Sequence, residues 1–300
     1  MPELPDVTLY VESLAARVIG TPLERLRVAS PFVLRSVEVP VGEVEGRRVT
    51  AVSRLGKRIV LALDGEWFVV IHLMVAGRLR WRPRGTKPPK GRGLAALDFP
   101  QGTVLFTEEG KKHRAGLWIV RGPAALAALD PGGAEPLDIP LAEFATRLRS
   151  ARHTLKRALT DPRLFSGIGN AYSDEILHAA RLSPLQLTTN LSDAEVARLH
   201  AAVRATLVAW TERLRAELGG GFPEKVTAFR EGMAVHGRYK KPCPACGSPV
   251  QRIRYAENEV NYCAACQTGG RVLADRAMSR LLREDWPRSI DEWEEKLGER

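Results

Sequence analysis

Four cysteines in two close pairs constrain the fold of this chain more than any other feature. Two residues separate Cys243 from Cys246, sixteen residues follow, and Cys263 and Cys266 then repeat the first spacing. Each C-x-x-C pair forms a tight turn that directs two thiolates at one ion, and two such turns complete a tetrahedron. The spacing predicts a structural zinc ribbon with one Zn²⁺ and no open position for catalysis. A reduced or redox-active pair of thiol motifs is the alternative.

Charge and composition narrow the class of protein. The 300 residues contain 45 Lys+Arg and 35 Asp+Glu, which gives a net charge of +10 and predicts an anionic partner, nucleic acid before membrane. Residues 221–256 contain seven basic and two acidic side chains, so the excess is concentrated beside the cysteines. The longest apolar run, 67–76, is far shorter than the roughly 20 residues of a membrane helix. Acidic residues near the N-terminus argue against a signal peptide, and we expect a cytoplasmic protein.

The first half of the chain has the pattern of one helix followed by short strands. Apolar residues from Val7 to Val18 recur on one helical face. Asp64-Gly65 then joins two strand-like segments and indicates a hairpin. These two segments, 58–63 and 67–73, belong to a set that we expect to be strands: 47–54, 58–63, 67–73, 78–82, 94–99 and 103–107. We therefore expect an α+β chain whose N-terminal domain, residues 1–122, is a β-sandwich or barrel with a leading helix.

The second half changes to helical periodicity. We expect a linker at 123–140, a helical domain at 141–237, a zinc ribbon at 238–270 and a C-terminal extension at 271–300. Within the helical part, Gly167-Ile168-Gly169 precedes Asn170 at the start of a predicted helix. Such a turn exposes backbone N–H groups that bind a phosphate. A plain connection between two helices is the alternative.

Several segments together resemble the formamidopyrimidine-DNA glycosylase / endonuclease VIII family of base-excision repair enzymes. They are the N-terminal Met1–Val7, the pair Gly56-Lys57, the segment His72–Arg78, the segment Gly167–Glu175 and the cysteine module. The resemblance covers residues 2 to about 267. It implies an N-terminal β-sandwich, a helix–two-turns–helix domain and a zinc finger, with damaged DNA in the cleft between the two halves.

The chemistry of the N-terminus agrees with this resemblance. Pro2 is small enough to permit removal of Met1, which leaves a secondary amine. Such an amine attacks the sugar C1′ to give a cationic iminium, an electron sink for breaking the neighbouring C–O bonds. The resemblance makes Pro2 the nucleophile and Glu3 the general acid/base, and it places Lys57 on a phosphate beside the lesion. Without the other motifs, Pro2-Glu3 reads as a disordered terminus and Lys57 as a solvated surface lysine.

The resemblance also implies a set of DNA contacts. His72 would face the DNA backbone, although a core histidine is the alternative on so apolar a strand. Met74, Val75, His113 and Arg114 occupy the places where the family fills the gap left by a flipped base. The remaining implied contacts are Lys156, Asn170, Arg254 and Asn258.

Three features depart from the family pattern. Asn258 stands where the zinc-finger hairpin usually carries a phosphate-binding arginine, which leaves Arg254 or Arg252, four and six residues earlier, as a substitute. Ala115 replaces a phenylalanine that wedges into the base stack. Residues 271–300 continue past the zinc finger with an amphipathic stretch.

We therefore predict a bifunctional DNA glycosylase/abasic-site lyase that ends in β,δ-elimination and whose substrate range differs from the oxidised-guanine norm. A non-catalytic protein that binds DNA damage or DNA structure on the same scaffold is the alternative. We expect a monomer that acts on damaged DNA, away from membranes, and is associated with the nucleoid if the source is bacterial.

Overall fold

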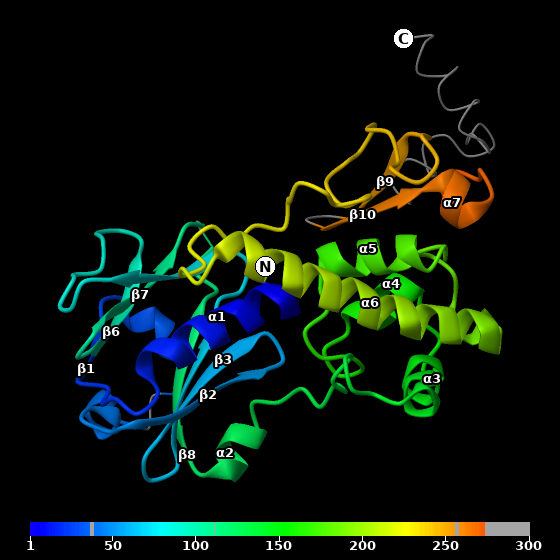
Figure 1. The fold of residues 1–300 in the computed structure, drawn as a ribbon. Helices are drawn as coiled ribbons and strands as arrows, with labels where there is room; N and C mark the ends of the chain where they lie inside the picture. The colour runs from blue at the N-terminus through cyan, green and yellow to red at the C-terminus, as the bar shows by residue number, and fades with distance from the viewer. Residues whose placement is uncertain (37–38, 111, 256–257, 274–300) are drawn as a thin grey trace. The chain divides into compact units, whose positions relative to one another are not determined.

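The chain forms two compact units in the computed structural model, which describes residues 1–36, 39–110, 112–255 and 258–273 (Figure 1). Unit 1 comprises residues 1–133 and 208–228, and unit 2 comprises residues 134–207 together with the chain from residue 229 on. Within the described ranges, none of the helices has the length and apolar character needed to cross a membrane.

Unit 1 contains two antiparallel four-stranded sheets. One sheet has the strand order β1 (Arg25–Val28), β6 (Gly93–Phe99), β7 (Gly102–Glu108), β5 (Gly77–Arg82). The other has the order β2 (Val49–Leu55), β3 (Arg58–Leu63), β4 (Trp67–His72), β8 (Gly116–Arg121). Short 3₁₀ turns lie at Pro31–Val33 and Val41–Val44, and the short helix α2 spans Pro123–Ala127.

The core of unit 1 follows from the alternation of side chains along its strands. Ile59, Leu61 and Leu63 of β3 are almost fully buried in one apolar cluster, as the two-residue period of a strand requires. Leu79 of β5 and Phe106 of β7 bring the other sheet into the same cluster. The two sheets therefore share a hydrophobic core, which is the arrangement of a β-sandwich.

Helix α1 (Leu4–Val18) packs along β2 and β3 and adds Val7, Tyr10, Leu14 and Val18 to this core. The returning segment 208–228 also belongs to unit 1. Its Phe222 ring lies 5.8 Å from the Tyr10 ring.

Polar contacts attach the same returning segment more firmly. Arg215 donates to Glu12 of α1 at 2.6 Å, and Arg82 of β5 forms an ion pair with Glu224. Val226 is buried in the sandwich core. Residues far along the chain are thus part of the first unit.

Unit 2 is helical with a two-stranded hairpin. Its helices are α3 (Leu141–Arg149), α4 (Leu155–Thr160), α5 (Asn170–Ala179) and the first part of α6 (Asp193–Leu218), with a 3₁₀ turn at Thr188–Asn190. The hairpin pairs β9 (Val250–Tyr255) with β10 (Asn258–Cys263), and α7 (Ala264–Thr268) follows. Ser192 and Glu195 form the reciprocal cap expected before α6, with the Ser192 N–H donating to Glu195 at 2.9 Å.

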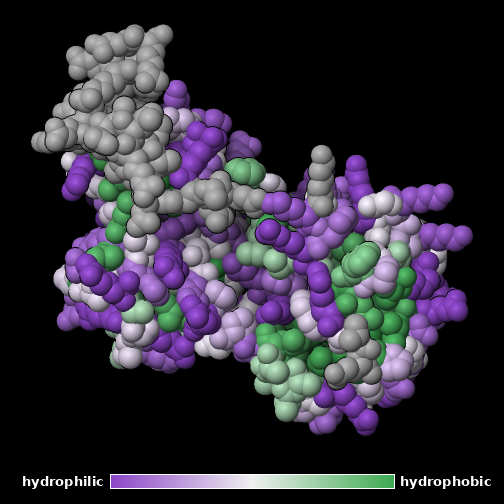
Figure 2. Space-filling view, turned by 180° about the vertical axis from the view of Figure 1, so that it is seen from behind, coloured by the Kyte–Doolittle hydropathy of each residue, from purple (hydrophilic) through white to green (hydrophobic). Residues whose placement is uncertain are grey.

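The expected α+β class, sandwich with a leading helix, helical region and cysteine ribbon are confirmed. The expected strands are present, and two more, β1 and β8, complete the sheets. The five-part division at residues 122, 140, 237 and 270 remains a prediction. Most of the extension, 274–300, lies outside the described residues. Hydrophilic side chains cover most of the face in Figure 2, and apolar ones form smaller patches.

Candidate active site and DNA contacts

The first residues lead directly into helix α1. Glu3 is the N-cap residue and forms a reciprocal capping box with Asp6, whose Oδ2 accepts a hydrogen bond from the Glu3 backbone N–H at 2.9 Å. This exchange satisfies amides that the first helical turn leaves without a partner. Glu3 is 3% exposed, and Pro2 is buried beside it. The helix therefore fixes a carboxylate one residue from Pro2.

Charged side chains of both signs surround the α-amino group. Burial lowers the pKa of the Met1 amine; nearby Arg78 and Lys57 lower it further, whereas Glu3 and Asp6 raise it. A lowered pKa increases the unprotonated, nucleophilic fraction at neutral pH. The structure thus brings Glu3 and Lys57 together and adds Arg78, to which the sequence pattern assigned no role.

Lys57 and His72 lie near each other although fifteen positions separate them. Lys57 occupies the tight turn between β2 and β3, where Gly56 has a φ of 62° that favours glycine. His72 ends β4 opposite Arg58. Burial first, and then Arg58 and Lys57, lower the pKa of His72 to about 4. The imidazole is therefore neutral at neutral pH and has one N–H to donate.

The turn after β4 carries two of the four residues expected to fill the gap, and it presents one of them to solvent. Val75 is 58% exposed, whereas Met74 is half-buried and has a φ of 51°. Gly77 closes the turn, because a Cβ there would lie 2.3 Å from the Leu73 carbonyl oxygen. The backbone thus directs Val75 outward and keeps Met74 against the protein.

A buried carboxylate holds the loop that contains His113 and Arg114, the other two residues expected to fill the gap left by a flipped base. Glu108 is 3% exposed and accepts hydrogen bonds from the backbone N–H groups of Arg114 at 3.0 Å and Ala115 at 3.2 Å. His113 Nδ1 lies 3.6 Å from its other oxygen, and the His113 side chain is 59% exposed. Ala115 is buried in the sandwich core, while Lys111 lies outside the described residues. His113 and Arg114 are therefore the exposed side chains at this end of the loop.

In unit 2, the glycine-rich turn does lead into a helix N-terminus. Gly167 has a φ of 78°, Gly169 is the N-cap residue of α5, and Asn170 is the first residue of that helix. The first-turn amides of an α-helix have no helical acceptor and carry a partial positive charge. The position of Asn170 is that expected for a phosphate contact, and the contact itself stays a prediction.

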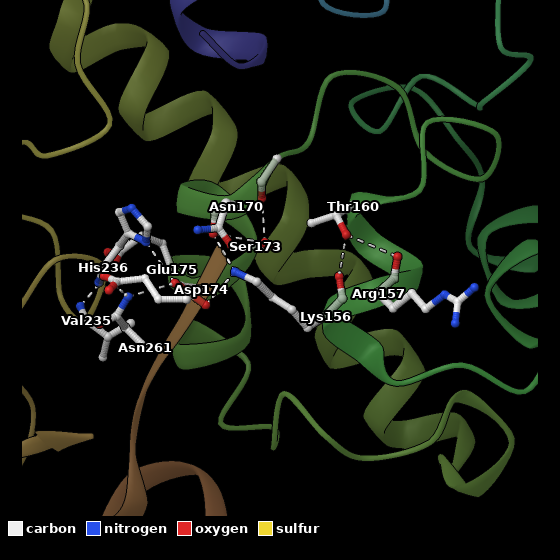
Figure 3. Close-up of polar contacts among 12 residues, drawn as sticks. Lys156, Arg157, Thr160, Asn170, Ser173, Asp174, Glu175, Val235, His236 and Asn261 are labelled. Atoms are coloured by element: carbon white, nitrogen blue, oxygen red, sulfur yellow. Dashed lines mark hydrogen bonds and ion pairs between the residues drawn. The ribbon is translucent and has the colours of Figure 1, made fainter. Parts of the chain in front are cut away.

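Lys156 is not a solvent-exposed lysine. It is 8% exposed, and its ammonium donates to Asp174 Oδ1 at 2.6 Å and to the Asn170 carbonyl (Figure 3). The second Asp174 oxygen lies 2.8 Å from His236 Nδ1 and 3.4 Å from Asn261 Nδ2. This buried network binds α4, α5, the 229–249 segment and β10 together. It favours a supporting role for Lys156, and its predicted DNA contact remains untested.

The neighbouring Glu175 has a structural function. Its carboxylate accepts hydrogen bonds from three successive backbone N–H groups, those of Ala234 at 2.7 Å, Val235 at 2.9 Å and His236 at 2.9 Å (Figure 3). Three amides stabilise a buried carboxylate strongly. Sequence spacing gives no signal for this contact, because about sixty residues separate the partners.

The four cysteine sulfurs lie within 4.8 Å of one another. The Sγ atoms of Cys243 and Cys266 are 3.9 Å apart, and those of Cys246 and Cys263 are 3.4 Å apart. A tetrahedral zinc site with Zn–S bonds near 2.3 Å requires sulfurs about 3.8 Å apart. The cluster therefore has the donor set and the size for one metal ion.

The hairpin above this cluster carries the last two expected DNA contacts. Arg254 is exposed on β9, and Asn258 begins β10, although the Asn258 side chain lies outside what the structure describes. Arg252 instead lies over the Tyr239 ring at 4.2 Å and within 3.7 Å of Glu259. Arg254 is thus an exposed side chain on the strand, and Arg252 packs against Tyr239 beside the hairpin.

Two family models match the chain. The formamidopyrimidine-DNA glycosylase N-terminal domain matches residues 1–113, and the H2TH domain of formamidopyrimidine-DNA glycosylase matches residues 133–215. A formamidopyrimidine-DNA glycosylase of Roseiflexus is 33% identical over 284 residues, which cover 89% of this chain and all of that protein.

Solved structures have the same fold. The crystal structure of the MutM (Fpg) protein from Thermus thermophilus has a TM-score of 0.76 at 32% identity, covering 89% of this chain and 98% of that one. A complex of the Lactococcus lactis Fpg with DNA containing an abasic site has a TM-score of 0.77 at 22% identity and covers 89% and 99% of the two chains. At that lower identity the likeness concerns the fold alone.

Proposed function

We propose a mechanism from the premise that this chain belongs to the formamidopyrimidine-DNA glycosylase family and is a DNA glycosylase of DNA repair. In the proposal, Pro2 excises a damaged base through a Schiff base and the protein then cleaves the strand as an abasic-site lyase. The observation that carries the proposal is the geometry at the N-terminus, where the buried Pro2 adjoins the carboxylate of Glu3, and Lys57 and Arg78 lie near the chain's first residue.

The proposed reaction begins after Met1 is removed. The Pro2 nitrogen attacks C1′ of the damaged nucleotide, the bond between C1′ and the base breaks, and the base leaves with a proton. The sugar ring then opens: the C1′–O4′ bond breaks, the ring oxygen takes a proton, and C1′ becomes the carbon of an iminium. This iminium has no nitrogen proton to lose, so it remains a cation. Loss of a C2′ proton breaks the 3′ C–O bond, and a second elimination breaks the 5′ C–O bond. Hydrolysis of the iminium returns the amine.

Glu3 has the position needed for proton transfer in this sequence. Its carboxylate adjoins Pro2 and is held by the N-terminus of α1, so we assign it protonation of the sugar ring oxygen and the later proton transfers. Lys57 and Arg78 lie near the N-terminus and offer positive charge to a phosphate beside C1′.

We propose damaged DNA as the substrate, contacted by both units. In unit 1 the neutral His72, the exposed Val75 and the loop with His113 and Arg114 would contact the backbone and the base stack. In unit 2 the helix terminus at Asn170 and the exposed Arg254 would bind phosphates. Met74, Lys156 and Asn258 remain predicted contacts.

We also propose that the four cysteines bind one Zn²⁺ and that the ion is structural. Four thiolates fill a tetrahedral site, which leaves no position for water or substrate. Cys243, Cys246, Cys263 and Cys266 would hold the ion, which would fix the β9–β10 hairpin that carries Arg254.

Borohydride trapping on abasic-site DNA tests the catalytic proposal. Borohydride reduces an iminium to a stable amine, so the wild-type protein should form a covalent protein–DNA adduct. The Pro2→Gly and Glu3→Gln variants should lose most of it. Glu12→Gln is the matched control, because Glu12 is an exposed carboxylate on the same helix.

Two results would contradict the mechanism. Mass spectrometry that finds Met1 retained in the active protein would place the amine on the wrong residue. Tight binding of abasic-site DNA without any trapped adduct would instead support the alternative, a non-catalytic protein that binds DNA damage.

A further inference from the structure

A histidine touches one of the four cysteine sulfurs from outside the predicted ligand set. His178 Nε2 lies 3.2 Å from Cys243 Sγ. His178 belongs to α5, whereas Cys243 begins the first C-x-x-C turn. In the described part of the chain, the cluster that can hold a metal consists of the four cysteines, without His178.

The chemistry of the sulfur fixes the direction of this hydrogen bond. A metal-bound thiolate has no proton and can only accept, so the His178 Nε2 must carry the hydrogen. Four thiolates around one divalent ion leave a net negative charge on the site. An N–H donor at Cys243 offsets part of that charge and restricts rotation of the thiolate.

Other side chains of α5 fix the position of this helix relative to the segment that leads to Cys243. Glu175 accepts hydrogen bonds from three backbone N–H groups in residues 234–236, just before the first C-x-x-C turn. Asp174 holds the His236 ring at 2.8 Å. Cys243 is 2% exposed, so water competes little for its sulfur. The helix therefore presents His178 to Cys243 from a fixed position.

We propose that His178 is a positioning residue for the metal site, whose Nε2–H orients the Cys243 thiolate and strengthens metal binding. This inference rests on the Zn²⁺ site proposed above. Helix α5 would then support two sites. It begins at Asn170, the expected phosphate contact, and His178 near its other end contacts the metal ligand Cys243.

The test measures metal affinity rather than repair activity. Full-length wild type, His178→Phe and His178→Gln are titrated with Zn²⁺ against a competing chelator. Phenylalanine keeps a ring but lacks the N–H, and we expect about tenfold weaker binding. Glutamine keeps an N–H donor and should recover part of the loss. His153→Phe, in the same unit before α4, should bind Zn²⁺ like the wild type.

Substitution with Co²⁺ supplies a spectroscopic readout. Removing an N–H···S hydrogen bond makes the thiolate a better electron donor, so His178→Phe should shift the sulfur-to-cobalt charge-transfer band to lower energy. Far-UV circular dichroism checks that each variant is folded. If His178→Phe does not fold, the polar His178→Gln compared with His178→Leu answers the same question.

The outcomes separate this inference from the metal site itself. Equal affinity and an unshifted band in His178→Phe overturn the role of His178 and leave the metal site standing. If the loss of Zn²⁺ affinity is as large in His178→Gln as in His178→Phe, then packing of the ring, and not its N–H group, strengthens metal binding. That result also overturns the role of His178. Wild-type protein that binds no Zn²⁺ overturns the proposed metal site. Charge-transfer intensity of only three thiolates in the wild type would make His178 a ligand and contradict the inference.

Discussion

Substitution of Asp174 by asparagine tests the buried network of unit 2. The Asp174 and Lys156 side chains are 0% and 9% exposed, and their charged atoms are 2.6 Å apart. Asparagine preserves the shape of the side chain but leaves a buried ammonium without its counter-charge. Removal of one partner from a buried ion pair costs about 3–5 kcal/mol. We expect the free energy of unfolding to fall by about that amount.

Urea unfolding followed by circular dichroism at 222 nm measures this loss, because unit 2 is largely helical. The double variant Asp174→Asn/Lys156→Met removes both charges and should be more stable than the sum of the two single losses predicts. Asp193→Asn is the matched control. Its partner is Arg149, and the Asp193 side chain is 94% exposed, so its loss should stay below about 1 kcal/mol.

Two results would refute the reasoning behind this prediction. One is an Asp174→Asn loss no larger than that of Asp193→Asn, which would mean that the ammonium is not effectively buried. The other is strict additivity in the double variant, which would mean that the two charges do not interact.

Two other predictions concern unit 1. Folding lowers the pKa of His72 from 6.5 to about 4, so between these pH values the unfolded chain binds a proton that the folded protein does not. The free energy of unfolding therefore falls as the pH drops from about 6.5 to about 4. His72→Gln should therefore lose less stability than the wild type across that window, and parallel urea midpoints would contradict this. Val75→Ala removes two carbons from an exposed side chain, at about 0.8 kcal/mol each, and should slow lesion excision about tenfold in single-turnover assays with little change in stability. Val208→Ala, also at an exposed valine, is its control, and an equal effect of the two would contradict a DNA contact by Val75.

Sequence predicted well those features that depend on residues close together in the chain. The apolar face from Val7 to Val18 and the cap at Ser192 depend on residues three or four apart, and both are confirmed. The two C-x-x-C pairs depend on a spacing of the same size, and their sulfurs do converge. Strand β1 escaped prediction because it is short and two of its four residues are arginines; only its pairing with β6 makes it a strand.

The site was predictable only in part for the same reason. Pro2, Glu3 and Lys57 could be named from their resemblance to a family, while Arg78 became visible only through its effect on the N-terminal amine. The partners of Lys156, Asn170 and Asp174, lie 14 and 18 residues away, so no local pattern indicated that this lysine is buried.

The return of residues 208–228 to unit 1 has a consequence for synthesis on the ribosome. Val226 belongs to the sandwich core, and Phe222 lies against Tyr10. The core that begins with the first helix is therefore complete only once residue 228 has left the exit tunnel, after residues 134–207 of unit 2 have been made. Nascent chains shorter than this expose an apolar surface around Tyr10, where a chaperone or a premature partner would bind.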